Sequence, residues 1–118
     1  MYSKILLVDD DPLLREVIGD FLSSSGYEVE SAANPEEALK SFSPGKFDLA
    51  LIDQNMKKST GIKLMSELHK RDPQTYFLIM TGYANLNSVF EAVGNSWSDY
   101  IIKPFQMMEL LNIVQKFA

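Results

Sequence analysis

Two runs of apolar residues in this sequence each end directly on carboxylates. Residues 4–8 (KILLV) are followed by Asp9 and Asp10. Residues 49–52 (LALI) are followed by Asp53. Such runs predict buried strands of a parallel sheet, and the carboxyl ends of these strands form the rim at which ligands bind. A single aspartate after a strand is usually an N-cap of the next helix. Three carboxylates at two strand ends favour chemistry instead.

Two further strand ends carry donors for an anion. The run 76–80 (YFLIM) ends at Thr81, and the short run 100–102 (YII) ends at Lys103. A carboxylate nucleophile, a hydroxyl group and a lysine that converge on one point suit phosphoryl transfer to an aspartate, because negative charge spreads over the transferred oxygens. Each residue alone has an ordinary structural explanation. Their shared placement at strand ends is what favours a phosphoryl site.

The three aspartates are expected to need a counterion. Adjacent parallel strands lie about 4.8 Å apart, and two ionised carboxylates at that separation repel by about 3 kcal/mol at an effective dielectric of about 20. A hard divalent cation with oxygen ligands removes this repulsion, and Mg²⁺ is the usual ion where a phosphoryl group completes the shell. The sequence therefore predicts Mg²⁺ binding by Asp9, Asp10 and Asp53.

Amphipathic helices are expected between the strands, so that strand and helix alternate five times. The helices are expected to begin at Pro12, Pro35, Gly61, Asn85 and Met107, and a further strand is expected at 27–32. Right-handed crossovers between parallel strands place helices on both faces of one sheet. The predicted fold is an α/β, flavodoxin-like (βα)₅ doubly wound sheet with strand order 2-1-3-4-5. This order makes the strands that end at Asp9 and Asp53 neighbours.

Composition narrows the class of protein. The 118 residues are 46% hydrophobic, which suits one compact domain over residues 1–118. The chain has no cysteine, which excludes disulfides and thiolate metal sites, and a net charge of −5, which disfavours direct nucleic-acid binding. It shows no signal peptide and no long apolar segment, so we expect no membrane contact and a cytoplasmic location. The only histidine, His69, is expected to be solvated, so the chain does not supply its own phosphodonor.

With these motifs the chain resembles the receiver domains of two-component response regulators over essentially its whole length. The resemblance is carried by Val8-Asp9-Asp10, by Asp53 with Asn55-Met56 and Gly61, by Met80-Thr81-Gly82 and by Lys103-Pro104-Phe105. Residues 80–84 (MTGYA) look most like receivers of the NtrC type. The resemblance implies that Asp53 is the phosphoacceptor. It also implies that the backbone carbonyl of Asn55 joins the three aspartates as a Mg²⁺ ligand, and that Thr81 and Lys103 bind the phosphoryl oxygens.

The resemblance further implies a signalling switch rather than an enzyme, one that catalyses only its own phosphorylation and dephosphorylation. The donor is expected to be a histidine kinase or a phosphotransfer protein. Thr81 and Tyr100 are the implied switch residues, and they act on the face made by the fourth helix, fifth strand and fifth helix. Asn55 and Tyr83 occupy the positions that tune the lifetime of the phosphorylated state. The implied readouts are an output domain in a longer chain, a separate partner, or a phosphorylation-dependent homodimer.

Two departures from the family pattern and two alternatives accompany this interpretation. Lys57 stands where proline is usual, and Ser96-Trp97 stands where Gly-Ala is usual. We expect Trp97 to plug the core, with an exposed anchor for a partner as the alternative. A phosphatase of the haloacid-dehalogenase type would need Asp-x-Asp, but Gln54-Asn55 follows Asp53. A receiver-like interaction module that is not phosphorylated remains the alternative function.

Overall fold

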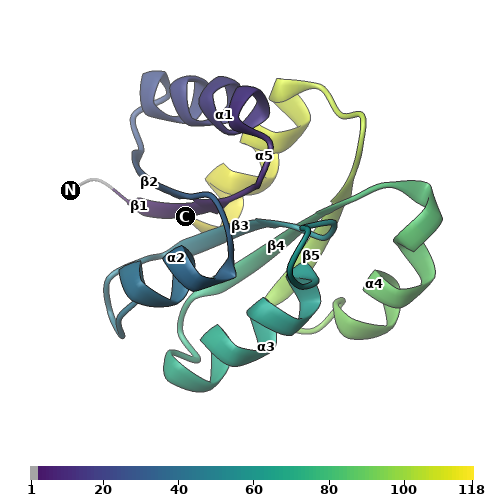
Figure 1. The fold of residues 1–118 in the computed structure, drawn as a ribbon. Helices are drawn as coiled ribbons and strands as arrows, with labels where there is room; N and C mark the ends of the chain where they lie inside the picture. Colours follow the sequence, from purple (N-terminus) through teal and green to yellow (C-terminus); the bar gives the residue numbers. More distant parts are fainter. Residues whose placement is uncertain (1–2) are drawn as a thin grey trace.

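The computed structural model describes residues 3–118, which form a five-stranded parallel sheet in the order β2-β1-β3-β4-β5 (Figure 1). The strands are β1 (Lys4–Val8), β2 (Glu28–Ala32), β3 (Leu49–Asp53), β4 (Tyr76–Thr81) and β5 (Ser98–Ile102). The helices are α1 (Pro12–Ser24), α2 (Pro35–Ser41), α3 (Gly61–Arg71), α4 (Leu86–Ala92) and α5 (Met107–Phe117), and a 3₁₀ turn, η1 (Tyr83–Asn85), precedes α4. The predicted fold class and strand order are confirmed.

Two hydrophobic cores lie on opposite faces of the sheet. Helices α1 and α5 cover one face, and α2, α3 and α4 cover the other (Figure 1). Successive strand residues point to opposite faces, so β1 contributes Leu6 and Val8 to one core and Ile5 and Leu7 to the other. The central strand β3 is buried along its whole length. This burial on both faces explains why its sequence is a continuous apolar run.

Capping side chains set where three helices begin, and therefore how the loops leave the strand ends. Asp11 before α1, Asn34 before α2 and Thr60 before α3 each accept a hydrogen bond from a backbone N–H in the first turn. Pro12 and Pro35 occupy first-turn positions, where proline loses no helical hydrogen bond. Helix α1 ends at Ser24, and Gly26 then turns the chain with φ +100°. Helix α1 thus begins at Pro12, as the sequence predicts, and Gly26 follows its end.

The apolar stripes of two helices are narrower than helical spacing in the sequence predicts. The predicted inner faces are Leu14, Val17, Ile18, Phe21 and Leu22 for α1, and Leu86, Val89, Phe90 and Val93 for α4. Val17 on α1 is 44% exposed and Phe90 on α4 is 65% exposed, although both follow helical spacing. Helix α4 has only seven residues, and of its expected inner face only Val89 is buried within the helix. The ring of Phe90 instead meets that of Tyr100 edge-on, with 6.3 Å between centroids. Spacing alone could not show that this helix buries so little.

His69 is not solvated, so that prediction is wrong. Its ring is half-buried and stacks on Trp97, with 3.7 Å between centroids and 9° between planes. Its Nδ1 atom is buried and has no hydrogen-bond partner among residues 3–118. The charged neighbours of His69 point to solvent, but its own position on α3 faces Phe77 of β4. Trp97 packs against the core cluster of that face, which supports its role as a core plug.

None of the helices formed by residues 3–118 combines the length and the apolar character needed to cross a membrane.

Candidate functional site

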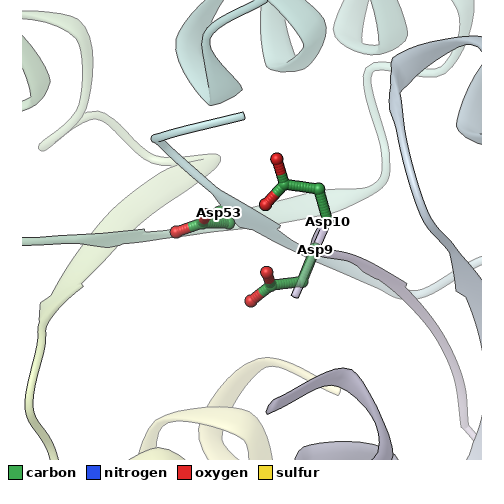
Figure 2. Close-up of side chains that lie close together, drawn as sticks. All are labelled: Asp9, Asp10 and Asp53. Carbon is green, nitrogen blue, oxygen red and sulfur yellow. The ribbon is translucent and has the colours of Figure 1, made fainter. Parts of the chain in front are cut away.

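Three carboxylates meet at the carboxyl ends of β1 and β3. One oxygen from each of Asp9, Asp10 and Asp53 can be chosen so that all three lie within 4.8 Å of one another. Figure 2 shows their side chains projecting from the adjacent ends of the two strands. The β1–β3 register pairs Val8 with Ile52. The next residue on each side is an aspartate, Asp9 after Val8 and Asp53 after Ile52. The structure thus brings together the aspartates that the strand order requires to be neighbours.

The environment of Asp9 fits a bound cation. Asp9 is 1% exposed, and its Oδ1 accepts a hydrogen bond from the backbone N–H of Asp11 at 2.9 Å. Its Oδ2 is buried and has no hydrogen-bond partner within the described residues. Burial raises the pKa of Asp9, and this outweighs the lowering effect of the Asp11 hydrogen bond. A buried carboxylate oxygen without a donor is costly, and a hard cation beside Asp10 and Asp53 would satisfy it.

Lys103 forms an ion pair with Asp53. Its Nζ lies 2.6 Å from Asp53 Oδ1, and the Asp53 side chain is 6% exposed. Burial raises the pKa of Asp53 above its usual range, while the hydrogen bond and charge of Lys103 act to lower it. Only one of the three clustered carboxylates is therefore paired with this lysine. The remaining negative charge leaves the site able to accept a divalent cation.

Thr81 ends β4, the strand next to that of Asp53. Its side chain is 1% exposed, and its hydroxyl donates a hydrogen bond to the carbonyl of Gly82 at 3.1 Å. Asp53 pairs with Met80 in the β3–β4 register, so Thr81 lies one position beyond Asp53 along the rim. The backbone N–H of Lys103 donates to the Thr81 carbonyl at 2.7 Å, which holds the ends of β4 and β5 together.

The loop after Asp53 is held by Gln54, whose role sequence reasoning missed, and by Gly61, which the sequence analysis includes in the family motif. Gln54 is 4% exposed, and its Oε1 accepts a hydrogen bond from the N–H of Ile62 at the start of α3. A Cβ on Gly61 would lie 2.6 Å from the carbonyl oxygen of Asp53, so only glycine fits there. The sequence does hold a signal for the role of Gln54, because a polar residue directly after a fully buried strand needs hydrogen-bond partners.

Arg15 and Asn85 each form a hydrogen bond near the site that the sequence did not reveal. The Arg15 guanidinium donates to the backbone carbonyl of Asp9 at 2.7 Å, and so ties α1 to the end of β1. The Asn85 side chain donates to Asn55 Oδ1 at 3.0 Å, which links η1 to the loop after β3. Both depend on how separate segments of the chain lie in space, for which helical or strand periodicity gives no signal.

The remaining predicted residues lie around this centre. Tyr83 is 73% exposed on η1. Tyr100 is half-buried on β5 and contacts the Phe90 ring. The backbone N–H of Lys57 donates to Asp10 Oδ2 at 3.1 Å. Beside the Asp53–Lys103 pair lies a mostly apolar cavity of about 330 Å³ that is lined by Leu14, Lys103, Pro104, Phe105 and Met107.

Comparisons with known proteins agree with this geometry. The family described as response regulator receiver domain matches residues 5–115. Response regulator protein FleR of Pseudomonas aeruginosa is 35% identical over 118 residues, but the chain spans only 25% of that protein. Chemotaxis protein CheY of Thermotoga maritima is 32% identical, with 98% of this chain and 100% of that protein covered. The solved structure of response regulator protein TrrA from T. maritima, in complex with Mg(2+)-BeF, superposes with a TM-score of 0.83 at 32% identity, with 98% and 99% of the two chains covered.

Proposed function

Because this chain belongs to the response regulator receiver domain family, whose members are the phosphoacceptors of two-component signalling, we propose that Asp53 accepts the phosphoryl group. The observation that carries the proposal is the environment of Asp53. This residue is 4% exposed, lies beside the carboxylates of Asp9 and Asp10, and forms an ion pair with the Lys103 ammonium. A buried carboxylate at a strand end, held by one cation and facing an acidic pair, suits attack on phosphorus. We propose that residues 1–118 form one receiver domain.

In the transfer, a P–O bond forms to a carboxylate oxygen of Asp53 while the P–N bond of a phosphohistidine breaks. The imidazole leaves with the electron pair of that bond. Lys103 contacts Asp53 Oδ1, and its ammonium would also pair with an oxygen of the incoming phosphoryl group. The Thr81 hydroxyl can turn from Gly82 to donate to a second oxygen. Both donors stabilise charge that develops on the transferred group.

Asp9, Asp10, Asp53 and the backbone carbonyl of Asn55 would hold Mg²⁺. The ion would offset the repulsion among the carboxylates and neutralise charge on the phosphoryl oxygens. Two observations support this set of ligands: Asp9 Oδ2 has no hydrogen-bond partner within residues 3–118, and oxygens of the three aspartates lie within 4.8 Å of one another. The relative TrrA, solved with Mg(2+)-BeF, supports the choice of metal.

The phosphorylated domain would act as a switch through Thr81 and Tyr100. Phosphorylation adds about two negative charges and strong acceptor oxygens, which would draw the Thr81 hydroxyl toward Asp53 and allow the Tyr100 ring to move inward. Tyr100 is half-buried and contacts the exposed ring of Phe90, so its movement would change the surface made by α4, β5 and α5. Phosphorylation would thus shift a pre-existing equilibrium of that surface.

Asn55 and Tyr83 are proposed to tune how long the phosphoryl group remains. Hydrolysis needs a water in line with the phosphorus. Asn55 is held by Asn85 on η1, the turn that also carries Tyr83. Tyr83 is 73% exposed, so its ring is free to cover or uncover the path of the water. The domain would in this way catalyse only its own phosphorylation and dephosphorylation.

A histidine kinase or a phosphotransfer protein is the proposed donor. FleR is four times as long as the matched region, so an output domain in a longer chain is proposed as one route to the response. A phosphorylation-dependent homodimer through the α4–β5–α5 surface is proposed as another. The predicted cytoplasmic location, the absence of membrane contact and the absence of direct nucleic-acid binding by this domain stay predictions.

The test is the intact mass of the protein after incubation with acetyl phosphate, with Mg²⁺ or with a chelator. We expect the mass to rise by one phosphoryl group only with Mg²⁺, and not at all in Asp53→Asn. The matched control is Asp48→Asn. Asp48 is an exposed aspartate just before the same strand, and its carboxylate accepts a hydrogen bond from the Lys4 N–H. No mass gain in the wild type would favour the non-phosphorylated interaction module.

A further inference from the structure

We infer that the backbone N–H of Lys57 is a positioning donor for the Asp10 carboxylate, an inference that rests on the proposed function and deepens it. The Lys57 nitrogen lies 3.1 Å from Asp10 Oδ2, and the two residues are 47 positions apart in the chain. The bond connects the turn after β1 to the loop after β3. It therefore joins the two segments that supply the clustered carboxylates.

Asp10 needs such a donor more than its neighbours do. Asp9 and Asp53 are 1% and 4% exposed, so packing restricts their side chains. Asp10 is only half-buried, and packing leaves its carboxylate freer to turn. Each carboxylate oxygen has its own lone pairs, so a hydrogen bond at Oδ2 leaves Oδ1 available to a cation. The Lys57 N–H would thus orient Asp10 without occupying its second oxygen.

Hydrogen bonds of this kind tune metal affinity. Carboxylates that ligate metals are themselves held by hydrogen bonds, and loss of such a partner typically weakens metal binding by about 10–100-fold. The donor at Lys57 is a backbone group, which every residue except proline carries. The departure from proline at this position therefore supplies a donor to the metal site, and the lysine side chain is not required for it.

Two substitutions at one position separate the N–H from the side chain. Both Lys57→Ala and Lys57→Pro remove the positive charge, but only Lys57→Pro removes the N–H. The measurement is the Mg²⁺ dissociation constant by isothermal titration calorimetry at a fixed ionic strength. We expect Lys57→Ala to bind at least as tightly as the wild type, and Lys57→Pro to bind about tenfold more weakly than Lys57→Ala.

Equal affinities of Lys57→Ala and Lys57→Pro, with Mg²⁺ bound normally by the wild type, would overturn this inference and leave the proposed function intact. Absence of Mg²⁺ binding by the wild type would overturn both. Circular dichroism shows whether Lys57→Pro folds.

A second measurement decides the matter if Lys57→Pro does not fold. Amide hydrogen exchange of Lys57 is followed by NMR without metal in the wild type, in Asp10→Ala and in Asp20→Ala. Asp20 is an exposed aspartate on α1 and serves as the control. We expect several-fold faster exchange at Lys57 in Asp10→Ala alone. Unchanged exchange in that variant would overturn the inference.

Discussion

The ammonium nitrogen of Lys103 lies 2.6 Å from Asp53 Oδ1, although the two residues are 50 positions apart in the chain. Strands β3, β4 and β5 are consecutive in the sheet, so the lysine reaches across the end of β4 to the aspartate. Thr81 ends the strand between them. Lys103 and Thr81 therefore follow strands on one side of β3, which carries the proposed acceptor, and Asp9 and Asp10 follow β1 on its other side.

Replacing Lys103 by methionine should slow phosphorylation by acetyl phosphate on the order of 100-fold, because a donor to the developing phosphoryl charge is lost. Mg²⁺ binding should persist and tighten, since a competing cation has left Asp53. Initial rates from intact mass and calorimetric Mg²⁺ titrations measure the two effects. Lys116→Met on α5 is the control. An unchanged rate in Lys103→Met would remove this residue from the mechanism.

Thr81→Ala should separate phosphorylation from the switch. The variant retains Asp53 and Lys103 and should still bind beryllofluoride with Mg²⁺. Without the hydroxyl, the Tyr100 ring should not be drawn inward, so the amide shifts of α4 and β5 should change much less than in the wild type. Heteronuclear NMR spectra with and without beryllofluoride measure this. Ser88→Ala, an exposed hydroxyl on α4, should respond like the wild type.

Tyr83→Ala should shorten the lifetime of the phosphorylated protein several-fold, because attacking water would no longer be screened. The decay of the phosphorylated mass after removal of the phosphodonor gives the lifetime. Phe90→Ala removes another exposed ring from the same region and should leave the decay rate unchanged. Equal lifetimes of Tyr83→Ala and the wild type would mean that the Tyr83 ring plays no part.

Gly61→Ala should destabilise the domain by about 1–3 kcal/mol, the usual cost of overpacking a tight site. The added Cβ would lie 2.6 Å from the Asp53 carbonyl oxygen, which is backbone and cannot turn away. Gly82→Ala is the control, because a Cβ there meets nothing within 4 Å among the described residues. Urea unfolding gives both free energies. Equal effects of the two substitutions would contradict the close approach at Gly61.

Asp72 should make stability depend on pH in the acid range. Its carboxylate accepts hydrogen bonds from the N–H of Gly45 and Gln74 and from the Thr75 hydroxyl, and the Gly45 bond contributes most to the lowered pKa. A lowered folded-state pKa adds stability above the unfolded value of about 3.9, and this stability is lost as the pH falls through the folded-state pKa.

Asp72→Asn should therefore cost about 1–3 kcal/mol near neutral pH, the usual cost of leaving buried donors unpaired. The difference from the wild type should shrink below about pH 4. Urea unfolding at several pH values measures it, with the exposed Asp20→Asn as the control. A difference that stays constant with pH would mean that the charge of Asp72 is not what stabilises the fold.

Periodicity and turn residues were enough to predict the sheet and its strand order. The buried runs that end at Asp9, Asp53, Thr81 and Lys103 reflect strands covered on both faces, and strand order then determines which ends meet. The proximity of the three aspartates follows from this topology alone.

Hydrogen bonds between separate segments could not be predicted in the same way. The bond from Arg15 to the Asp9 carbonyl depends on how α1 lies against the end of β1, and the bond from Lys57 to Asp10 depends on the path of the loop after β3. Packing of single residues was also beyond periodicity. His69 has charged neighbours in the sequence, yet it stacks on Trp97 because that side of α3 faces the sheet.

The proposal that Asp53 accepts the phosphoryl group is tested by locating that group chemically. Borohydride reduces an aspartyl phosphate to homoserine, which survives digestion. Trypsin should release residues 47–57, a peptide with two aspartates, Asp48 and Asp53, that fragment-ion masses distinguish. If Asp53 is the phosphoacceptor, homoserine will be found at position 53 after incubation with acetyl phosphate and Mg²⁺. Homoserine at Asp48, Asp9 or Asp10, or none in a protein whose mass has risen, would contradict the proposal.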